Sequence, residues 1–281
     1  MTPRWALKRA LKWAMEWSVQ MSGAAWAYRR TATFRNGFRI LTYHKIADRP
    51  ENSFTVKTAH FREHMRYLSD HCNVQSMEDI LDLIARGGRP ETGTVAVTFD
   101  DGYRESAYET AQTLQHLGIP ATFFVVTGVL DNEVELPAGP YLTWPEVKQM
   151  ADAGLTIGSH TVSHPSLGEI NRHEVEKELA VSGKRIAEEL GSFPSGVAYP
   201  YGTLRDFSSE TARTARRVGY RYAVTAVHGL NQTGGDPFLL RRTTVGAGDG
   251  LRTFRLIVKG CLDGWSMVDR WGSRLQRTYD W

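Results

Sequence analysis

Cysteine is scarce in this chain of 281 residues, which contains only Cys72 and Cys261. Two thiols cannot form a disulfide scaffold or a cysteine-based zinc site, and their rarity is typical of a reducing compartment. Any metal ion must therefore use histidine and carboxylate ligands. Internal repeats and low-complexity segments are also missing. With 41% hydrophobic and 23% charged residues, the composition excludes a disordered or fibrous chain.

Long uncharged apolar runs are missing as well. Glu16 and Gln20 interrupt the N-terminal candidate, which falls short of the roughly 20 residues needed to cross a bilayer. We therefore expect a chain that does not span a membrane. A cleaved signal peptide is not expected either, because Arg29 and Arg30 lie just past the A-x-A-like segment Ala25–Ala27.

Positive charge is concentrated at the two ends of the chain. Residues 1–40 hold eight basic residues against one acid, and residues 250–281 hold six against three. Because the whole chain has a formal charge of only +3, the part between these ends is net negative. This distribution argues against a core that binds nucleic acid and favours ends that meet an anionic surface.

Both basic ends have an amphipathic helical pattern. Near the N-terminus an apolar face with Leu7, Trp13 and Trp17 opposes a basic face with Lys8 and Lys12, and residues 254–275 show a similar pattern. Tryptophan beside basic residues is typical of a helix in a membrane interface. The alternative is that both helices pack on the rest of the protein. We favour packing for the C-terminal helix, and both interpretations stay open for the N-terminal one.

Strand and helix patterns alternate between residues 37 and 248. Short β-branched or aromatic runs predict strands at Phe38–Tyr43, Thr94–Phe99, Ala121–Val126, Leu155–Ser159, Gly196–Tyr199, Tyr220–Thr225 and Leu239–Val245. Helical spacing predicts helices at Ala59–Ser69, Met77–Ala85, Arg104–Leu117, Trp144–Ala153, Arg172–Leu190 and Phe207–Val218. Four of these helices end just before a glycine suited to a C-cap. The repeated order predicts an α/β barrel with a parallel sheet.

This pattern predicts three regions. A basic amphipathic helical extension occupies residues 1–36, the barrel occupies residues 37–249, and a C-terminal amphipathic helix occupies residues 250–281.

Two adjacent carboxylates close one of the predicted strands. Asp100 and Asp101 lie in the run TFDDGY at residues 98–103. The carboxyl ends of the strands of a parallel barrel share one face, where active sites are built. There, one carboxylate can hold a metal ion while its neighbour acts on a water molecule. The alternative is an aspartate that caps the next helix, and this motif alone would favour that role.

Two histidines four residues apart follow another predicted strand. His160 and His164 lie in the run SHTVSHP at residues 159–165, where Pro165 breaks any helix. Both imidazoles can face one ion, and neutral histidine together with aspartate suits zinc or a similar divalent metal. A single histidine would be structural more often than not. Two histidines and an aspartate pair at neighbouring strand ends favour a metal site.

A third motif, AYPYG at residues 198–202, completes a family resemblance. The three motifs, in this order, are similar to those of the polysaccharide deacetylases of carbohydrate esterase family 4, which share the NodB homology domain. The similarity extends over residues 38–248 and includes LTW at residues 142–144, and the combination of TFDDG with HxxxH is highly specific. The resemblance implies a distorted (β/α)7 barrel and a metal-dependent hydrolase that removes acetyl groups from N-acetylated sugars.

The resemblance also implies the roles of individual residues. Asp101, His160 and His164 resemble the metal ligands, and Asp100 resembles the catalytic base. Three protein ligands leave room on the ion for a water molecule and for the amide carbonyl oxygen. The metal would lower the pKa of this water, and Asp100 would take its proton.

The AYPYG motif is implied to stabilise the negative charge of the tetrahedral intermediate. By resemblance, the backbone N–H of Tyr201 meets the oxyanion, an interaction worth about 3 kcal/mol in typical systems. Pro200 would fix the loop that aims this donor and would border the substrate. Without the other motifs, this segment would be interpreted as an aromatic turn.

The chain departs from the family pattern at two points. Many members carry an arginine where this chain has Ala198, and that arginine orients the base. We predict that Arg242 replaces it, because a guanidinium can hold Asp100 bidentately, whereas neighbouring Arg241 is expected at the surface. The chain also lacks a clear Leu-x-His motif near its C-terminus, which often supplies the general acid.

Further candidates surround these motifs. His44, at the carboxyl end of the strand Phe38–Tyr43, is the best-placed alternative acid, and its other interpretation is a hydrogen bond to the base or to a loop. The YH start is similar to a family branch found in exopolysaccharide and cell-envelope pathways. Trp144 is a candidate for lining the sugar subsite, with packing beneath a helix start as its alternative. His228 lies in a polar loop and is expected to face solvent or substrate.

These inferences predict a metal-dependent N-deacetylase that acts on an amino-sugar glycan or a lipid-linked sugar of the cell envelope. It would hold one divalent ion, with zinc first and cobalt, nickel or manganese as alternatives. We expect a cytoplasmic protein without nucleic-acid partners, in peripheral contact with the inner face of the cytoplasmic membrane through its N-terminal helix. Two other hypotheses stay open. One is a glycan-binding barrel that holds metal without turnover, and the other is an amidohydrolase acting on a small non-sugar amide.

Overall fold

A computed structural model describes residues 30–49, 52–137 and 139–263. In these residues the main sheet contains β1 Gly37–Tyr43, β4 Asn73–Val74, β5 Thr94–Phe99, β6 Ala121–Val125, β7 Thr156–Ser159, β8 Gly196–Ala198, β9 Tyr222–Val224, β10 Asn231–Gln232 and β11 Thr243–Thr244. A small second sheet pairs β2 Lys45–Ile46 with β3 Thr55–Val56. The helices are α3 Ala32–Arg35, α4 Thr58–His71, α5 Met77–Ala85, α6 Arg104–Leu117, α7 Thr127–Leu130, α8 Trp144–Asp152, α9 Arg172–Leu190, α10 Ser209–Val218 and α11 Leu251–Val258.

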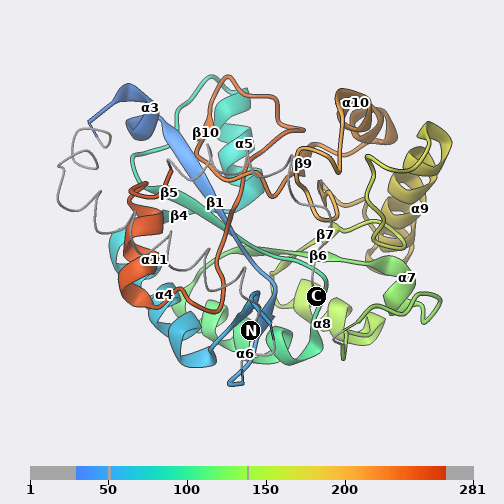
Figure 1. The fold of residues 1–281 in the computed structure, drawn as a ribbon, viewed down its shortest axis with the longest axis horizontal. Helices are drawn as coiled ribbons and strands as arrows, with labels where there is room; N and C mark the ends of the chain where they lie inside the picture. The colour runs from blue at the N-terminus through green and yellow to red at the C-terminus, as the bar shows by residue number, and fades with distance from the viewer. Residues whose placement is uncertain (1–29, 50–51, 138, 264–281) are drawn as a thin grey trace.

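The main sheet curls into a barrel of parallel strands (Figure 1). Its order is β10-β1-β5-β6-β7-β8-β9, in which only β10 runs antiparallel to its neighbour. The segment after β10 links the two sides, because Leu240 bridges to Val224 of β9 and β11 pairs in parallel with β1. This curled parallel sheet with outer helices confirms the predicted class of fold.

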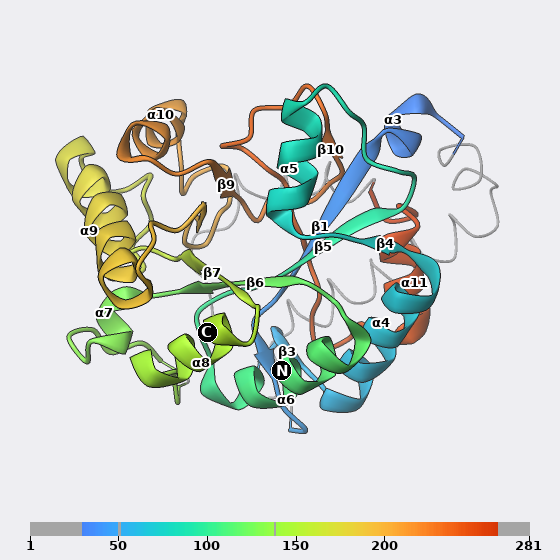
Figure 2. The same ribbon diagram turned by 180° about the vertical axis from the view of Figure 1, so that it is seen from behind.

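The helices pack around the curled sheet. In both views α9 and α10 lie side by side on one flank, and α4 and α11 lie on the opposite flank (Figures 1 and 2). Met77 and Ile80 of α5 join a buried cluster with Phe38, Ile40 and Phe124 of the strands. A larger cluster fills the space between the sheet and α4, α6, α8 and α11. This packing holds the strand ends that carry the sequence motifs.

Most predicted elements have the predicted bounds within two or three residues. Helices α5, α6 and α9 and strand β5 match the prediction at both ends. Helix α10 begins at Ser209 instead of Phe207, because the side chain of Ser208 caps it by accepting hydrogen bonds from the backbone of Glu210 and Thr211. The glycines that follow the four helices all have positive φ, as the C-cap prediction requires.

The predicted strand Leu239–Val245 is wrong in its extent. Only Thr243–Thr244 forms a regular strand, because the segment changes partners along its length. Leu240 bonds to β9, whereas the backbone N–H of Val245 donates to the carbonyl oxygen of Thr42 in β1.

The two ends of the chain are described only in part. Helix α11 ends at Val258, and Gly260 beyond it has a φ of 72°, so the predicted continuous helix over residues 254–275 is interrupted. Phe254 of α11 stacks on His64 of α4 at a centroid distance of 3.9 Å, which places this helix on the barrel. The predicted N-terminal helix and residues 264–281 lie outside the described residues, and the boundaries at residues 36 and 249 stay predictions. Across the described part of the chain, every helix is too short or too polar to cross a bilayer.

Candidate metal centre

The aspartate and histidine motifs meet at the carboxyl edge of the barrel. Asp101 follows β5 and His160 follows β7, with only β6 between these strands. One ligand atom from each of Asp101, His160 and His164 lies within 4.8 Å of the other two, and all three side chains are buried. The Nε2 atoms of His160 and His164 lie 3.4 and 3.5 Å from Oδ1 of Asp101. The structure therefore brings together the three residues predicted as metal ligands.

A backbone carbonyl orients the ring of His160. Its Nδ1 lies 2.8 Å from the carbonyl oxygen of Ala198, at the end of β8. An Nδ1–H that donates to this oxygen leaves the Nε2 lone pair directed toward Asp101, as a metal ligand requires. Ala198 thus contributes a backbone acceptor at the position where many family members carry an arginine.

Backbone strain is concentrated at this site. In the described part of the chain, positive φ occurs at five residues other than glycine, namely Asp101, Asn132, Thr161, His164 and Tyr201, with values from 57° to 69°. All but Asn132 belong to the three motifs. Such conformations cost about 1–3 kcal/mol each and persist only where surrounding contacts enforce them. Holding these side chains in place therefore lowers the conformational stability of the protein.

Arg242 holds Asp100 through a buried bidentate pair. Its Nη1 and Nη2 each donate to one carboxylate oxygen at 2.6 Å. The guanidinium is itself fixed, because Nε donates to the carbonyl oxygen of Thr225 and Nη1 also donates to the hydroxyls of Thr42 and Thr98. This is the contact predicted for Arg242, and its effect on catalysis stays a prediction.

The pKa values follow from burial and from these partners. Burial raises the pKa of Asp100, but Arg242 and His160 outweigh it and leave the pKa below its usual value. Burial also raises the pKa of Asp101, yet hydrogen bonds from His160 and His164 bring it well below its usual value. In His160, burial lowers the pKa, whereas Asp101 and Asp100 raise it above its ordinary value.

The donor set fits a divalent cation. Arg242 neutralises the charge of Asp100, so Asp101 supplies the carboxylate charge that faces the two imidazoles. One carboxylate oxygen and two imidazole nitrogens, gathered in a buried position, are ligands that zinc and similar ions accept.

The AYPYG motif lies next to His164. The ring of Tyr201 is 4.9 Å from the ring of His164, between centroids. Pro200 is buried, and its carbonyl oxygen accepts a hydrogen bond of 2.6 Å from the backbone of Gly202, which tightens the turn. Tyr201 is thus brought to the candidate centre. Its predicted role as oxyanion donor and the predicted contact of Pro200 with substrate stay predictions.

His44 lies at the same edge of the barrel. It is half-buried, and its ring packs 4.9 Å from the ring of Phe54. Burial lowers the pKa of His44, and the carboxylates of Asp101 and Asp100 partly oppose this effect. The charges of both carboxylates therefore act on His44, and its role as the general acid stays a prediction.

Two further candidate residues, Trp144 and His228, are buried in the structure. Trp144 is buried at the start of α8, where its Nε1 donates to Asp131 at 2.7 Å and Arg185 lies over its ring. The packing alternative therefore describes Trp144, and its contact with a sugar stays a prediction. His228 was expected to face solvent or substrate, but it is buried and lies 3.5 Å from Asp263, so that expectation is wrong.

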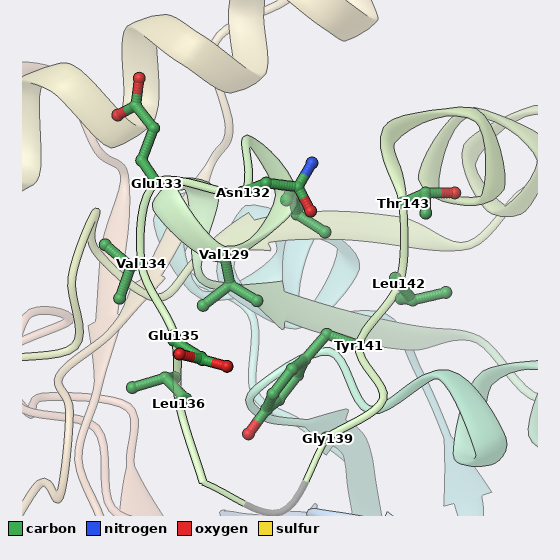
Figure 3. Close-up of a pocket in the computed structure, with 11 residues that line it drawn as sticks. Val129, Asn132, Glu133, Val134, Glu135, Leu136, Gly139, Tyr141, Leu142 and Thr143 are labelled. Atoms are coloured by element: carbon green, nitrogen blue, oxygen red, sulfur yellow. The ribbon is translucent and has the colours of Figure 1, made fainter.

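An open pocket of about 610 Å³ is formed by the loop between α7 and α8 (Figure 3). Glu135 and Tyr141 line it, and their polar ends face the same space in Figure 3. Tyr141 pairs with Tyr103 of the aspartate motif, which attaches this wall of the pocket to the centre. Burial raises the pKa of Tyr141 to about 12. The sequence pattern predicts no strand or helix between Val126 and Trp144, and nothing in it shows what this segment packs against.

Sequence reasoning also missed Asp206, which joins two loops of the site. Its carboxylate accepts hydrogen bonds from the hydroxyl of Ser166, after the histidine motif, and from the backbone and hydroxyl of Thr203, after AYPYG. No spacing signal links residues so far apart in the sequence.

A curled parallel barrel that gathers an aspartate, two histidines and a second, arginine-paired aspartate at its carboxyl edge defines a metal-dependent hydrolase. Residues 87–223 match the family model of the polysaccharide deacetylases. YxkH of Bacillus subtilis (strain 168), named for the same family, is 27% identical over 210 residues, which cover 74% of this chain and 71% of YxkH.

Two further comparisons agree. The poly-β-1,6-N-acetyl-D-glucosamine N-deacetylase of Staphylococcus aureus (strain MRSA252) is 25% identical over 204 residues, which cover 69% of this chain and 67% of that protein. The solved structure of the deacetylase PplD from Streptococcus pyogenes has a TM-score of 0.71 and 22% identity, and covers 80% of this chain and 99% of PplD. The similarity to the structure of PplD supports the assignment of the fold.

Proposed function

We propose that this hydrolase removes the N-acetyl group from an amino sugar in a glycan or lipid-linked sugar of the cell envelope. One observation carries the proposal: Asp100, fixed by Arg242, lies beside the buried cluster of Asp101, His160 and His164. The match of residues 87–223 to the polysaccharide deacetylase family model supports hydrolysis of an acetamide. The N-acetyl-D-glucosamine in the name of the staphylococcal relative supports an amino-sugar substrate.

The chemistry divides between a bound ion and the side chains around it. Bound by Asp101, His160 and His164, a divalent ion would polarise the acetyl carbonyl and lower the pKa of a water molecule. Asp100 has a lowered pKa, so it is ionised at neutral pH and can accept a proton. Arg242 holds both oxygens of Asp100 and fixes their direction, while each oxygen keeps a second lone pair for the incoming proton.

Two other groups complete the proposed reaction. The backbone N–H of Tyr201 would stabilise the charge that develops on the acetyl oxygen. His44 would donate a proton to the leaving amine, since the chain lacks a clear Leu-x-His motif near its C-terminus that could supply this acid. We propose zinc as the ion, because two imidazoles and one carboxylate suit it, with cobalt, nickel or manganese as the ions to compare.

Acetate release tests the proposal. Metal-loaded protein is incubated with two envelope fractions, one of lipid-linked glycans and one of soluble or polymeric glycans. We expect release from one fraction, and a loss of at least about 100-fold for Asp100→Asn, which keeps the size of the side chain and removes the base. An Asp100→Asn variant as active as the wild type would contradict the role of Asp100.

The same assay separates the alternative functions. A non-sugar acetamide serves as the control substrate, and turnover of that compound alone would support the small-amide amidohydrolase. Metal-loaded protein that binds glycan but releases no acetate would support the binding barrel.

We further propose that the enzyme is cytoplasmic and contacts the inner face of the membrane through its N-terminal segment. The support is compositional, namely the basic excess of residues 1–40 beside the apolar face with Leu7, Trp13 and Trp17. Full-length protein should co-sediment with vesicles containing anionic lipid, and much less with neutral vesicles or after deletion of residues 1–29. Equal binding of the truncated and full-length proteins would contradict this proposal.

A further inference from the structure

The loop between the two metal-binding histidines is held by a glutamate from a distant helix. We propose that Glu178 of α9 is a positioning residue for the metal centre, because it fixes the loop that carries His160 and His164. The proposal rests on the proposed function in one respect, since it takes these two histidines as ligands of the ion.

Three hydrogen bonds join Glu178 to this loop. Its Oε2 accepts from the backbone N–H groups of Val162 and Ser163 at 2.8 and 3.0 Å, and its Oε1 accepts from the hydroxyl of Ser163 at 2.6 Å. Hydrogen bonds to an ionised carboxylate are roughly twice as strong as neutral ones. One side chain thus anchors both residues at the middle of the loop.

The other hydrogen bonds of the loop involve different backbone groups. The other amides of the loop donate as follows: His160 to the carbonyl of Val125, Thr161 to the hydroxyl of Ser159, and His164 to the hydroxyl of Thr161. The carbonyls of Thr161 and Val162 accept from Thr127 and Gly128 at the start of α7. The acceptor for both middle amides is therefore Glu178.

The loop needs this anchor because it is strained. Thr161 and His164 have φ values of 68° and 57°, which residues with a Cβ rarely adopt. Without Glu178, the amides of Val162 and Ser163 can turn to water, and the loop can relax toward ordinary φ values. Relaxation of this kind would move the ring of His164 away from Asp101.

The helix that carries Glu178 is a rigid platform. Helix α9 has 19 residues, begins with a capping box at Asn171 and lies beside β7 and α7 (Figure 2). One turn after Glu178, Ser182 accepts a hydrogen bond of 2.7 Å from Ser159, at the start of the loop. The same face of α9 therefore holds both the start and the middle of the metal-binding loop.

Metal affinity tests the proposal without relying on turnover. The full chain is stripped of metal, and zinc binding is measured by competition with a chromophoric chelator. For Glu178→Ala we expect an affinity about 10–100-fold weaker than that of the wild type, the range typical of residues that orient metal ligands. Glu178→Gln keeps an acceptor oxygen for the amides and should recover part of the loss. Glu176→Ala is the matched control, since Glu176 is an exposed residue of the same helix paired with Arg217, and it should bind zinc as the wild type does.

Amide exchange in the metal-free protein supplies a second readout. The amides of Val162 and Ser163 should exchange more than tenfold faster in Glu178→Ala than in the wild type, while the amides of β7 keep their protection. If Glu178 stabilised the whole domain instead of this loop, Glu178→Ala would speed amide exchange throughout the domain.

Each outcome decides between the claims. Wild-type protein that binds no zinc would overturn the metal centre and this proposal together. Wild-type binding with a Glu178→Ala affinity within twofold of it would overturn only the role of Glu178. If Glu178→Ala does not fold, Ser163→Ala removes one of the three hydrogen bonds, and we expect about two- to fivefold weaker zinc binding. An unchanged affinity of Ser163→Ala would then overturn the proposal.

Discussion

Asp100 is buried, and burial on its own would raise the pKa of its carboxyl group. Arg242 reverses this effect, so the base stays ionised in a site with little water. A guanidinium also fixes the plane of the carboxylate, which a point charge cannot do. The pair therefore sets both the charge and the direction of the proposed base.

We predict that Arg242→Lys lowers kcat/KM at least tenfold, because an ammonium cannot form the two parallel hydrogen bonds. The active form of Asp100 is the carboxylate. Weaker stabilisation of that form raises its pKa, so activity should be lost at a higher pH as the solution is acidified. The pH profile of kcat/KM measures this shift, with Arg241→Lys as the control. An acidic limb that coincides with that of the wild type would refute the assignment.

Chemical type and spacing were enough to place an aspartate pair and two histidines at neighbouring strand ends, and the family resemblance then assigned Asp101 as the ligand. Asp101, His160 and His164 follow parallel strands, whose ends must share an edge. Glu178 and the carbonyl of Ala198 could not be predicted, because a helix glutamate or a backbone oxygen has no distinguishing pattern. Trp144 shows the converse case, since an aromatic residue at a helix start suits both a subsite and a core.

Helix α6 is followed by a C-cap glycine, Gly118, in the left-handed conformation that favours glycine. Gly118 has a φ of 63°, and an added Cβ would meet no atom within 4 Å. Gly118→Ala should therefore lower the free energy of unfolding by about 1–2 kcal/mol through backbone strain alone. Urea unfolding measures this loss, and Gly234→Ala is the control, since Gly234 has an ordinary φ and equally open surroundings. If Gly118→Ala and Gly234→Ala unfold with the same free energy, α6 does not need a left-handed glycine at its C-cap.

Helices α4 and α11 meet at a buried histidine that should make stability depend on pH. His64 stacks on Phe254, and burial together with His60 lowers its pKa from 6.5 to about 3. Below pH 6.5 the unfolded chain binds a proton that the folded chain does not, so the free energy of unfolding falls by about 1.4 kcal/mol per pH unit. This contribution is constant above that pH.

The variant His64→Leu isolates this effect. Urea unfolding at pH 7.5, 6.0 and 5.0 should show the wild type losing more stability than the variant between pH 6.0 and 5.0, by up to about 1.4 kcal/mol. Parallel losses in the two proteins would mean that His64 takes up its proton in the folded state.

Local periodicity explains why most elements were predictable. Strand β5 and helices α5, α6 and α9 are marked by continuous apolar or amphipathic runs and by flanking caps. The segment 239–245 has the composition of a strand, but its hydrogen bonds go first to β9 and then to β1. A change of partner depends on how the barrel closes, which no local pattern records.

The whole molecule places its chemistry at one edge of the barrel. The alternation of strands and helices was sufficient to predict the parallel barrel. Its carboxyl edge gathers Asp100, Asp101, His160 and Tyr201 from segments far apart in the sequence, and the side chain of Arg242 reaches Asp100 from the residue before β11. These residues lie close together because parallel strands of one barrel end at the same edge. The course of the segment that forms the pocket near Tyr141 could not be predicted, because it depends on tertiary contacts with the aspartate motif.

The measurement that tests the central claim most directly is metal-dependent acetate release. Protein stripped of metal by a chelator is titrated with zinc in the presence of N-acetylated glycan, and acetate and bound zinc are measured in the same samples. We predict no release without metal, a rise that saturates at one ion per chain, and neither binding nor release for His160→Ala. Full activity in protein shown to be metal-free, or undiminished activity of His160→Ala, would contradict the account.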